Sequence, residues 1–259
     1  MFQVRREFPP NLSLSMNKRS VKIIIILSFF ILFSAFFYLH LSVKLWDIDF
    51  CWHIATGKYI VTERHLPEKD PFSFTSLMEE NRNIFPEREN FILKQYWLAQ
   101  VLFYIIFANT GPTGIILLRS AILLITILIV YWQLQRSGVS FYISFAFVFL
   151  LFMMSTKSIG ERPVLFSILF TAVLLFLLED FVDRKNKTLF LLVPVMLLWS
   201  NMHGGFIIGI IIISVFMFAE TVKIFFKKSN LTKREMRIFY IATGLSIIAS
   251  FMNPTGWEA

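Results

Sequence analysis

The sequence has almost no cysteine and few charged residues. The first shortage excludes a disulfide bond within the chain, and the second argues against a soluble protein. Its single cysteine, Cys51, leaves no partner for a disulfide bond within the chain, so cysteine content says nothing about the redox compartment. Asp, Glu, Lys and Arg make up only 16% of the 259 residues, whereas soluble domains average about 25%. Because 56% of the residues are hydrophobic, the chain has too little polar surface for a soluble globular protein.

Long hydrophobic runs account for this composition and predict an all-α, polytopic transmembrane helical bundle. The mean hydropathy is +0.67, and phenylalanine alone occurs 31 times. A helix needs about 20 predominantly apolar residues to cross the hydrocarbon core of a bilayer. We expect about seven spans, with interfacial helices in the first outer loop. The expected spans cover residues 21–40, 114–134, 139–155, 163–180, 188–202, 205–222 and 238–252.

One further apolar stretch, residues 96–108, decides the orientation of every span after it. Its 13 residues cover about 20 Å as a helix, which is too short for a hydrocarbon core of about 30 Å. If the stretch does not cross, the short loops place most of their basic residues on one side, which the positive-inside rule identifies as the cytoplasm. We therefore expect an interfacial or re-entrant helix here. The basic residues then placed inside are Arg5, Arg6, Lys18, Arg19, Lys22, Arg136, Arg184, Lys185, Lys187, Lys223, Lys227, Lys228, Lys233, Arg234 and Arg237.

These spans divide the chain into four parts. The parts are a cytoplasmic tail at 1–20, a first transmembrane span at 21–40, an extracytoplasmic loop with interfacial helices at 41–113, and a transmembrane bundle at 114–259. The first span is interpreted as an uncleaved signal anchor, because Phe36, Phe37 and Tyr38 occupy the place where a cleavage site needs small residues.

The net charge of +8 would favour nucleic acid as a partner if the protein were soluble. Here the basic residues lie in short segments between apolar runs, where they orient the chain in the membrane. We therefore expect membrane lipids as partners and no nucleic acid.

The richest polar cluster follows the first span and contains Asp47, Asp49 and His53. Asp49 is suited to cap a helix that begins at Phe50, and His53, four residues on, then shares a face with it. A carboxylate at the mouth of an apolar cavity is poorly solvated, so its pKa rises toward that of a general base. The alternative is a solvated carboxylate pair capping an interfacial helix, with His53 as a packing residue.

A second cluster lies between two expected spans and contains Glu161, Arg162 and Pro163. Pro163 suits the first turn of the following helix, which leaves Arg162 at the outer membrane surface. There its guanidinium group could hold a phosphate through two hydrogen bonds. The alternative is an Arg162 that extends to the surface and pairs with Glu161.

A third cluster, with Asn201 and His203 before a di-glycine, forms a tight hairpin between two spans. Because the preceding span is short, Asn201 and His203 are expected to lie below the membrane surface. Polar groups at that depth cost free energy unless they face a cavity or one another. The alternative is a purely structural hairpin. Arg119 lies about five residues inside its span, so it is expected to extend outward or to contact an anionic lipid head.

Several motifs along the chain resemble those of a large group of bacterial multi-span membrane proteins, which are similar to the GT-C superfamily of glycosyltransferases. That superfamily includes the protein mannosyltransferases and lipid A aminoarabinose transferase. The motifs are Asp47-x-Asp49-x-x-Trp52-His53-x-Ala55-Thr56-Gly57, Leu66-Pro67-x-x-Asp70-Pro71-Phe72-Ser73-Phe74-Thr75, Trp97-Leu98-Ala99-Gln100, Glu161-Arg162-Pro163, Asn201-x-His203-Gly204-Gly205 and Asn253-Pro254.

The resemblance implies transfer of a sugar from a polyprenyl-phosphate donor on the extracytoplasmic side of a bacterial cytoplasmic membrane. The superfamily's catalytic acidic residue lies just after the first span, a place matched by Asp47 or Asp49. The Asp-Ile-Asp sequence departs from the Asp-Glu pair of the mannosyltransferases, so the choice of base and any divalent metal stay open. The expected substrate-binding residues are Arg119, Glu161, Arg162, Asn201 and His203.

Two other functions are compatible with the sequence. A transporter or flippase for lipid-linked sugars would carry charged or broken helices at mid-bilayer. The polar residues instead gather at one face of the membrane, which favours interfacial chemistry. Members of the group usually continue past the Asn-Pro motif with further spans, so a truncated, non-catalytic remnant is the third possibility.

Overall fold

The computed structural model describes residues 43–68, 71–72, 94–158 and 160–256, together with the isolated positions 27, 34 and 38. The chain divides into two compact units, Met1–Ser42 and Val43–Ala259, and the second is described below. The expected cytoplasmic tail, nearly all of the expected first span and the part of the outer loop between residues 73 and 93 lie outside the described residues.

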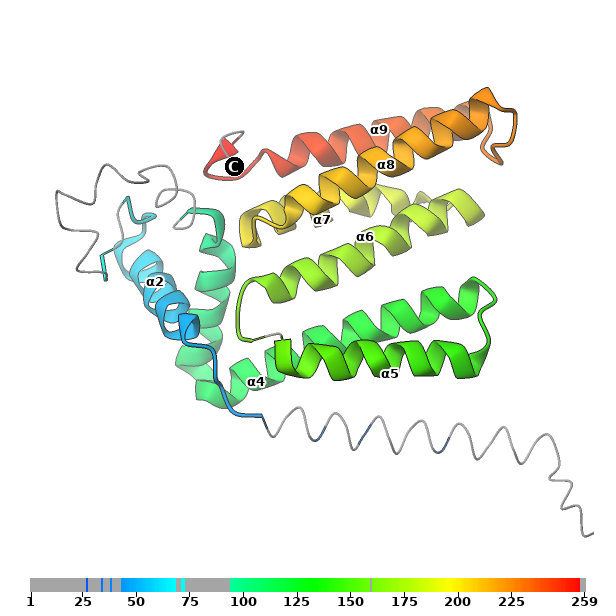
Figure 1. Cartoon of the computed structure of the whole chain (residues 1–259). Coiled ribbons are helices and arrows are strands. Elements are labelled where there is room, and N and C mark those ends of the chain that lie inside the picture. Colours follow the sequence, from blue (N-terminus) through cyan, green and yellow to red (C-terminus); the bar gives the residue numbers. More distant parts are fainter. Residues whose placement is uncertain are drawn as a thin grey trace, which may run out of the picture. The chain divides into compact units, whose positions relative to one another are not determined.

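Every regular element in the described ranges is a helix, which confirms the all-α fold class (Figure 1). The elements are α2 (Asp49–Glu63), α4 (Trp97–Arg136), α5 (Phe141–Ser158), α6 (Val164–Arg184), the 3-10 helix η3 (Lys187–Leu191), α7 (Leu192–Met202), α8 (Phe206–Phe225) and α9 (Lys233–Ser250).

Three helices, α4, α6 and α8, are long and apolar enough to cross a membrane. Two further apolar helices, Phe141–Met154 and Lys187–Met202, are shorter. Helix α9 begins with charged residues, which leaves only the part from Ile238 onward apolar. The described residues therefore support a membrane protein, whereas the count of about seven spans stays a prediction.

The expected interfacial stretch and the span after it are joined in α4, which breaks at Gly111. This residue has φ 63° and ψ −159°, a conformation that side chains with a Cβ disfavour strongly. Pro112 follows and suits the first position of the restarted helix, because it has no N–H to leave unpaired. The part before the break lies beside α2, and the part after it lies beside α5 (Figure 1). The predicted boundary at residues 113–114 is thus a helix break rather than the end of a loop.

Helix α7 lies in the middle of the bundle and packs against α4, α6, α8 and α9. Its residues Leu192, Met196 and Trp199 are completely buried. Gly209 lets α8 approach this row closely, since a Cβ at that position would lie 2.7 Å from the Trp199 ring. The core therefore forms around a short apolar helix that neighbouring helices surround.

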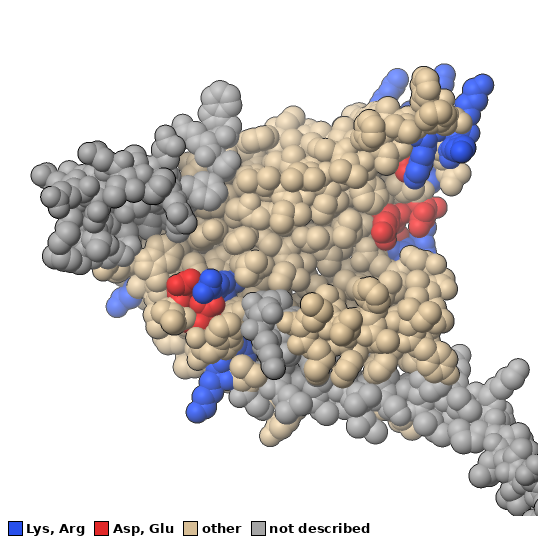
Figure 2. Space-filling view, in the orientation of Figure 1, with Lys and Arg blue, Asp and Glu red and all other residues tan. Residues whose placement is uncertain are grey.

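The connections between the helices lie at two opposite ends of the bundle. The α4–α5, α6–α7 and α8–α9 connections share one end, and α2, the α5–α6 connection and the α7–α8 hairpin share the other (Figure 1). The first end is strongly basic, with Lys and Arg gathered over the α8–α9 connection (Figure 2). Basic residues in or beside these connections are Arg136, Arg184, Lys185, Lys187, Lys223, Lys227, Lys228, Lys233, Arg234 and Arg237.

Glycine at position 57 sets how closely α2 packs on α4, because a Cβ there would collide with the backbone carbonyl of Gln100. Gly57→Ala should therefore destabilise the protein by about 1–3 kcal/mol, the usual cost of overpacking a tight contact. Gly244→Ala is the matched control: it also lies in a helix but has open space around it, and should stabilise by about 0.5–1 kcal/mol. Thermal unfolding of the purified full chain in detergent separates the two, and equal midpoints would contradict the packing described.

Candidate functional site

The hydrogen-bond acceptors at the start of α2 come from Asp47, which directly precedes the N-cap residue Ile48. The Asp47 Oδ1 atom accepts a hydrogen bond from the Asp49 N–H at 3.0 Å, and the Asp47 carbonyl accepts one from Phe50 at 3.2 Å. The expectation that Asp49 caps this helix is wrong, because Asp49 already lies in its first turn. Its carboxylate is thereby left available for contacts away from the helix end.

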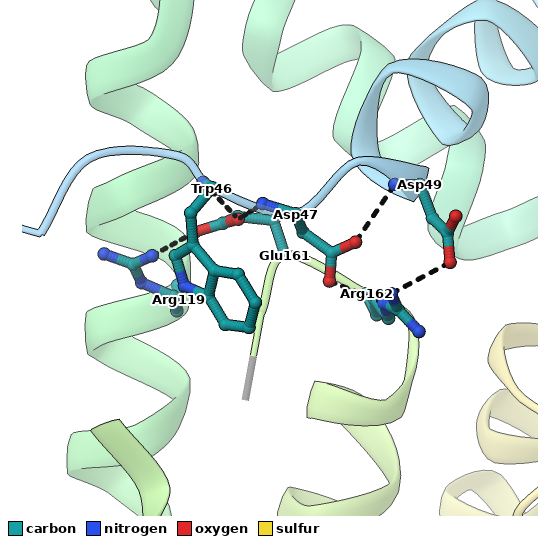
Figure 3. A network of polar contacts seen from close by, with 6 residues as sticks. All are labelled: Trp46, Asp47, Asp49, Arg119, Glu161 and Arg162. Carbon is teal, nitrogen blue, oxygen red and sulfur yellow. Dashed lines mark hydrogen bonds and ion pairs between the residues drawn. The ribbon is translucent and has the colours of Figure 1, made fainter. Parts of the chain in front are cut away.

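Arg162 joins the two aspartates (Figure 3). Its Nε donates to Asp47 Oδ2 at 2.5 Å, and its Nη2 lies 3.0 Å from Asp49 Oδ2. The hydrogen bond to Asp47 raises the pKa of Arg162, so the guanidinium stays charged. The environments of the carboxylates differ: the Asp47 side chain is 1% exposed and that of Asp49 is 57% exposed. The solvated pair considered from the sequence is therefore wrong for Asp47.

Gly160 allows the α5–α6 connection to lie directly against Asp47. A Cβ at this position would overlap the Asp47 carboxylate, so only glycine permits the contact. Sequence reasoning did not single out this residue, although it directly precedes the Glu-Arg-Pro motif. The connection that carries Arg162 is thus fitted to the segment that carries Asp47.

Behind these residues, Arg119 and Glu161 form a completely buried ion pair, with side chains 1% and 0% exposed. The Glu161 Oε2 atom also accepts hydrogen bonds from the N–H groups of Trp46 and Asp47, both at 3.4 Å. Arg119 Nη2 donates to the carbonyl of Val43 at 2.8 Å. The pair therefore fastens the backbone of residues 43–47 to helix α4 and to the α5–α6 connection (Figure 3).

Two expectations are corrected by this pair. Arg119 does not extend outward to solvent or to a lipid head, because its side chain is enclosed by protein. Glu161 pairs with Arg119 and not with its neighbour Arg162, because consecutive residues of the connection point in opposite directions (Figure 3).

His53 faces α4 and is almost fully buried. Its Nδ1 lies 3.3 Å from the Gln100 side-chain nitrogen, an amide donor, so Nδ1 acts as the acceptor and the ring proton lies on Nε2. Burial lowers the pKa of His53 to about 4, against weaker opposing effects of Asp49 and Asp47. The ring is therefore neutral near pH 7.

His203 is held in one neutral tautomer by two donors. The Gly205 N–H donates to His203 Nδ1 at 2.9 Å. The Ser167 hydroxyl accepts from Trp199 Nε1 at 2.7 Å, so it donates its own hydrogen to the same Nδ1, also at 2.7 Å. Burial lowers the pKa of His203 to about 4. The Nε2 atom therefore carries the proton, and no described residue accepts it.

The Asn201 side chain uses both its oxygen and its nitrogen in hydrogen bonds within the protein. Its Oδ1 accepts from Trp97 Nε1 at 2.9 Å, and its Nδ2 donates to the carbonyls of Leu197 at 2.8 Å and Met252 at 3.0 Å. The buried Gln95 side chain donates a further hydrogen bond to the carbonyl of Ser200, near the end of α7. Asn201 thus joins α4, α7 and the end of α9, which favours the structural alternative for this residue.

The polar residues from three distant segments meet in one cavity of about 660 Å³. It brings together five predicted site residues and leaves out the other three: Arg119 and Glu161 lie behind it, and Asn201 does not line it. The lining residues are Trp46, Asp47, Asp49, Trp52, His53, Tyr96, Gly160, Arg162, Pro163, Val164 and His203.

Sequence reasoning assigned no role in the site to Ser167, Gln100 or Tyr96, although Gln100 belongs to the Trp-Leu-Ala-Gln motif. Ser167 and Gln100 fix the tautomers of His203 and His53, and Tyr96 stacks on His203 with ring centroids 5.2 Å apart. In the described ranges, no group of three or more His, Cys, Asp or Glu side chains is arranged to hold a metal ion. The cavity thus combines an exposed carboxylate, a guanidinium group, a neutral imidazole donor and aromatic rings.

Comparisons with family models, with curated proteins and with solved structures found no match to this chain. The resemblance to the GT-C superfamily therefore stays a prediction from the motifs.

Removing one partner of the buried ion pair should leave an uncompensated charge inside the protein. Arg119→Met or Glu161→Gln should each destabilise by about 3–5 kcal/mol, and the double variant by less than the sum. Glu179→Gln is the matched control, because Glu179 is exposed and contacts Gln133 only at the surface. Thermal unfolding in detergent measures the cycle, and additive effects would show that the pair is not coupled.

The two neutral histidines predict a loss of stability in acid. Between pH 6.5 and about 4 the unfolded chain binds protons that folded His53 and His203 do not, so stability falls as the pH falls through this window. The loss is at most about 1.4 kcal/mol per pH unit for each ring. His53→Gln should flatten the decline in thermal midpoint between pH 7 and pH 5, whereas the exposed control His65→Gln should not. A decline unchanged by His53→Gln would contradict the burial described.

Proposed function

We propose that this protein is a membrane glycosyltransferase of the GT-C type that transfers a sugar from a polyprenyl-phosphate donor. The observation that carries the proposal is the cavity itself. It joins an exposed carboxylate on α2, a guanidinium group before α6 and a neutral imidazole donor after α7. A glycosyl transfer from a phosphate leaving group needs a base for the acceptor and fixed donors for the phosphate.

Asp49 is the proposed base. Its carboxylate is more than half exposed and lines the cavity, so an acceptor hydroxyl can reach it. Asp47 has the role of a positioning residue, because one of its oxygens receives the Asp49 N–H and the other receives Arg162 Nε. We therefore propose Asp49, and not Asp47, as the base.

Arg162 and His203 are the proposed phosphate-binding residues. Asp47 engages Nε of Arg162 and Asp49 engages Nη2, while Nη1 donates to no side chain in the part of the chain described. The donor phosphate competes with Asp49 for Nη2, so donor binding releases the Asp49 carboxylate to act as a base. His203 Nε2–H adds a neutral donor on another element.

In the proposed reaction, the acceptor oxygen attacks the anomeric carbon of the sugar and its proton passes to Asp49. The bond between the anomeric carbon and the phosphate oxygen breaks, and polyprenyl phosphate leaves with the bonding electrons. Fixed donors such as Arg162 stabilise the charge that develops on this phosphate. Trp46 and Trp52 offer apolar ring faces in the same cavity for the body of the sugar.

The charge distribution supports an extracytoplasmic cavity. The basic connections lie at the end of the bundle opposite the cavity (Figures 1 and 2). By the positive-inside rule we propose that this end faces the cytoplasm. The proposed cytoplasmic N-terminus rests in addition on the predicted first span at 21–40, and the proposed bacterial inner membrane rests on the resemblance to the GT-C superfamily.

A transporter or flippase is the competing function, and the α4 break and the Arg119–Glu161 pair are the features that would favour it. However, both side chains of the pair are enclosed, and neither lines the cavity described above. The pair is therefore accounted for by its bonds to residues 43–47, and the transferase is the better-supported proposal.

Asp49→Asn tests the proposed base directly. It should lower transfer by about 10²–10⁴-fold while leaving the thermal midpoint nearly unchanged, because Asp49 is exposed. Asp47→Asn should lower the midpoint, since it removes the buried negative charge that pairs with Arg162, although the amide oxygen can still accept the Asp49 N–H. Transfer of radiolabelled sugar from a set of polyprenyl-phosphate donors in membranes is the assay.

Glu63→Gln is the matched control for that experiment, because it removes an exposed carboxylate at the other end of α2 and should leave transfer unchanged. Full activity of Asp49→Asn would remove Asp49 as the base. No transfer by the unmodified protein from any donor in the set would contradict the glycosyltransferase itself.

A further inference from the structure

A second cavity of about 440 Å³ lies at the basic end of the bundle, between the end of α8 and the first turns of α9. None of its lining residues belongs to the site described above. It is lined by Ile224, Lys233, Met236, Arg237, Tyr240 and Ile241. We refer to it as the α8–α9 groove.

The α9 residues of this groove form one stripe along the helix. Positions 233, 236, 237, 240 and 241 follow the spacing of three and four residues that places side chains on one helix face. Lys233 and Arg237, one turn apart, occupy the end nearest the connection, and Tyr240 and Ile241 continue the stripe toward the apolar part of α9. The groove is therefore cationic at one end and apolar at the other.

Two carboxylates near the groove, those of Glu235 and Glu220, already have other partners. Glu235 accepts the N–H and the hydroxyl of Thr232 in the cap of α9, and Glu220 pairs with Lys223 at 2.6 Å. In the part of the chain described, neither Lys233 nor Arg237 forms an ion pair. Two exposed cations of the groove thus have no carboxylate to balance them.

The apolar part of the groove is partly open and fixed in shape. Ile224 is 42% exposed and Ile241 is 49% exposed, while the Tyr240 hydroxyl is held 2.6 Å from Thr221 Oγ1 of α8. This hydrogen bond joins the two helices along the groove. An apolar chain lying there would cover side chains that otherwise face the surroundings of the bundle.

We propose that the α8–α9 groove binds an anionic phospholipid, with the headgroup phosphate on Lys233 and Arg237 and an acyl chain along Tyr240 and Ile241. A phospholipid has the same order of parts as the groove, with an anionic phosphate next to a hydrocarbon chain. Basic pockets between helix ends at the cytoplasmic face of membranes attract such headgroups. A free phosphate would use only the cationic end and would leave the apolar residues uncovered.

The test is native mass spectrometry of the full chain purified in detergent and titrated separately with phosphatidylglycerol, phosphatidylcholine and inorganic phosphate. The unmodified protein should bind phosphatidylglycerol at least about tenfold more tightly than phosphatidylcholine. The variant Lys233→Gln/Arg237→Gln should lose this preference. The matched control Lys227→Gln/Lys228→Gln removes the same charge from the neighbouring connection, outside the groove, and should keep it.

Three outcomes would overturn the proposal. Equal binding of the two lipids would show that the headgroup charge is not recognised. Equal loss of the preference in both double variants would show general attraction to the basic end and no site in the groove. Inorganic phosphate binding as tightly as phosphatidylglycerol would show an anion site without a lipid. Ile241→Ser then checks the apolar part, and should weaken phosphatidylglycerol binding with Lys233 and Arg237 intact.

Discussion

The buried ion pair between Arg119 and Glu161 is the contact on which the arrangement of the site depends. A charge enclosed by protein is stable only when a partner and further hydrogen bonds replace the water it has lost. Glu161 satisfies this requirement by accepting from Arg119 and from the N–H groups of Trp46 and Asp47, and Arg119 by donating also to Val43. The pair therefore joins helix α4, the α5–α6 connection and the segment before α2, three parts of the chain that carry or position the site.

Charged residues that lie close together in the sequence have different roles because of this arrangement. Glu161 turns inward to Arg119, and the next residue, Arg162, turns outward to the aspartates. Asp47 is enclosed and accepts a hydrogen bond at the start of α2, whereas Asp49 faces the cavity. In each of these two pairs, one residue forms structural contacts inside the protein, and the other stays accessible to a ligand. The two histidines add neutral donors, since burial keeps both rings uncharged near pH 7.

The membrane explains why the two cavities are lined by residues of different chemistry. At one end, aspartates, an arginine and aromatic rings from three segments enclose a polar cavity. At the other end, the connections are rich in Lys and Arg, and the α8–α9 groove carries cations beside apolar residues. Between the ends, apolar helices leave few polar groups unpaired, because hydrocarbon offers them no hydrogen-bond partner. The two ends can therefore serve different ligands.

The sequence by itself determined the all-α class, the apolar helices, the boundary between the stretch at 96–108 and the apolar run from 114, and the three polar clusters, because hydrophobicity, glycine and proline act locally. Only the tertiary structure decided that Arg162 joins Asp47 and Asp49, that Glu161 pairs with Arg119, and that Asn201 joins helices away from the cavity. The partner of a buried charge or amide depends on which helices pack together, and spacing along the chain does not encode that packing. For the same reason the sequence named five residues of the cavity but not the division of their roles.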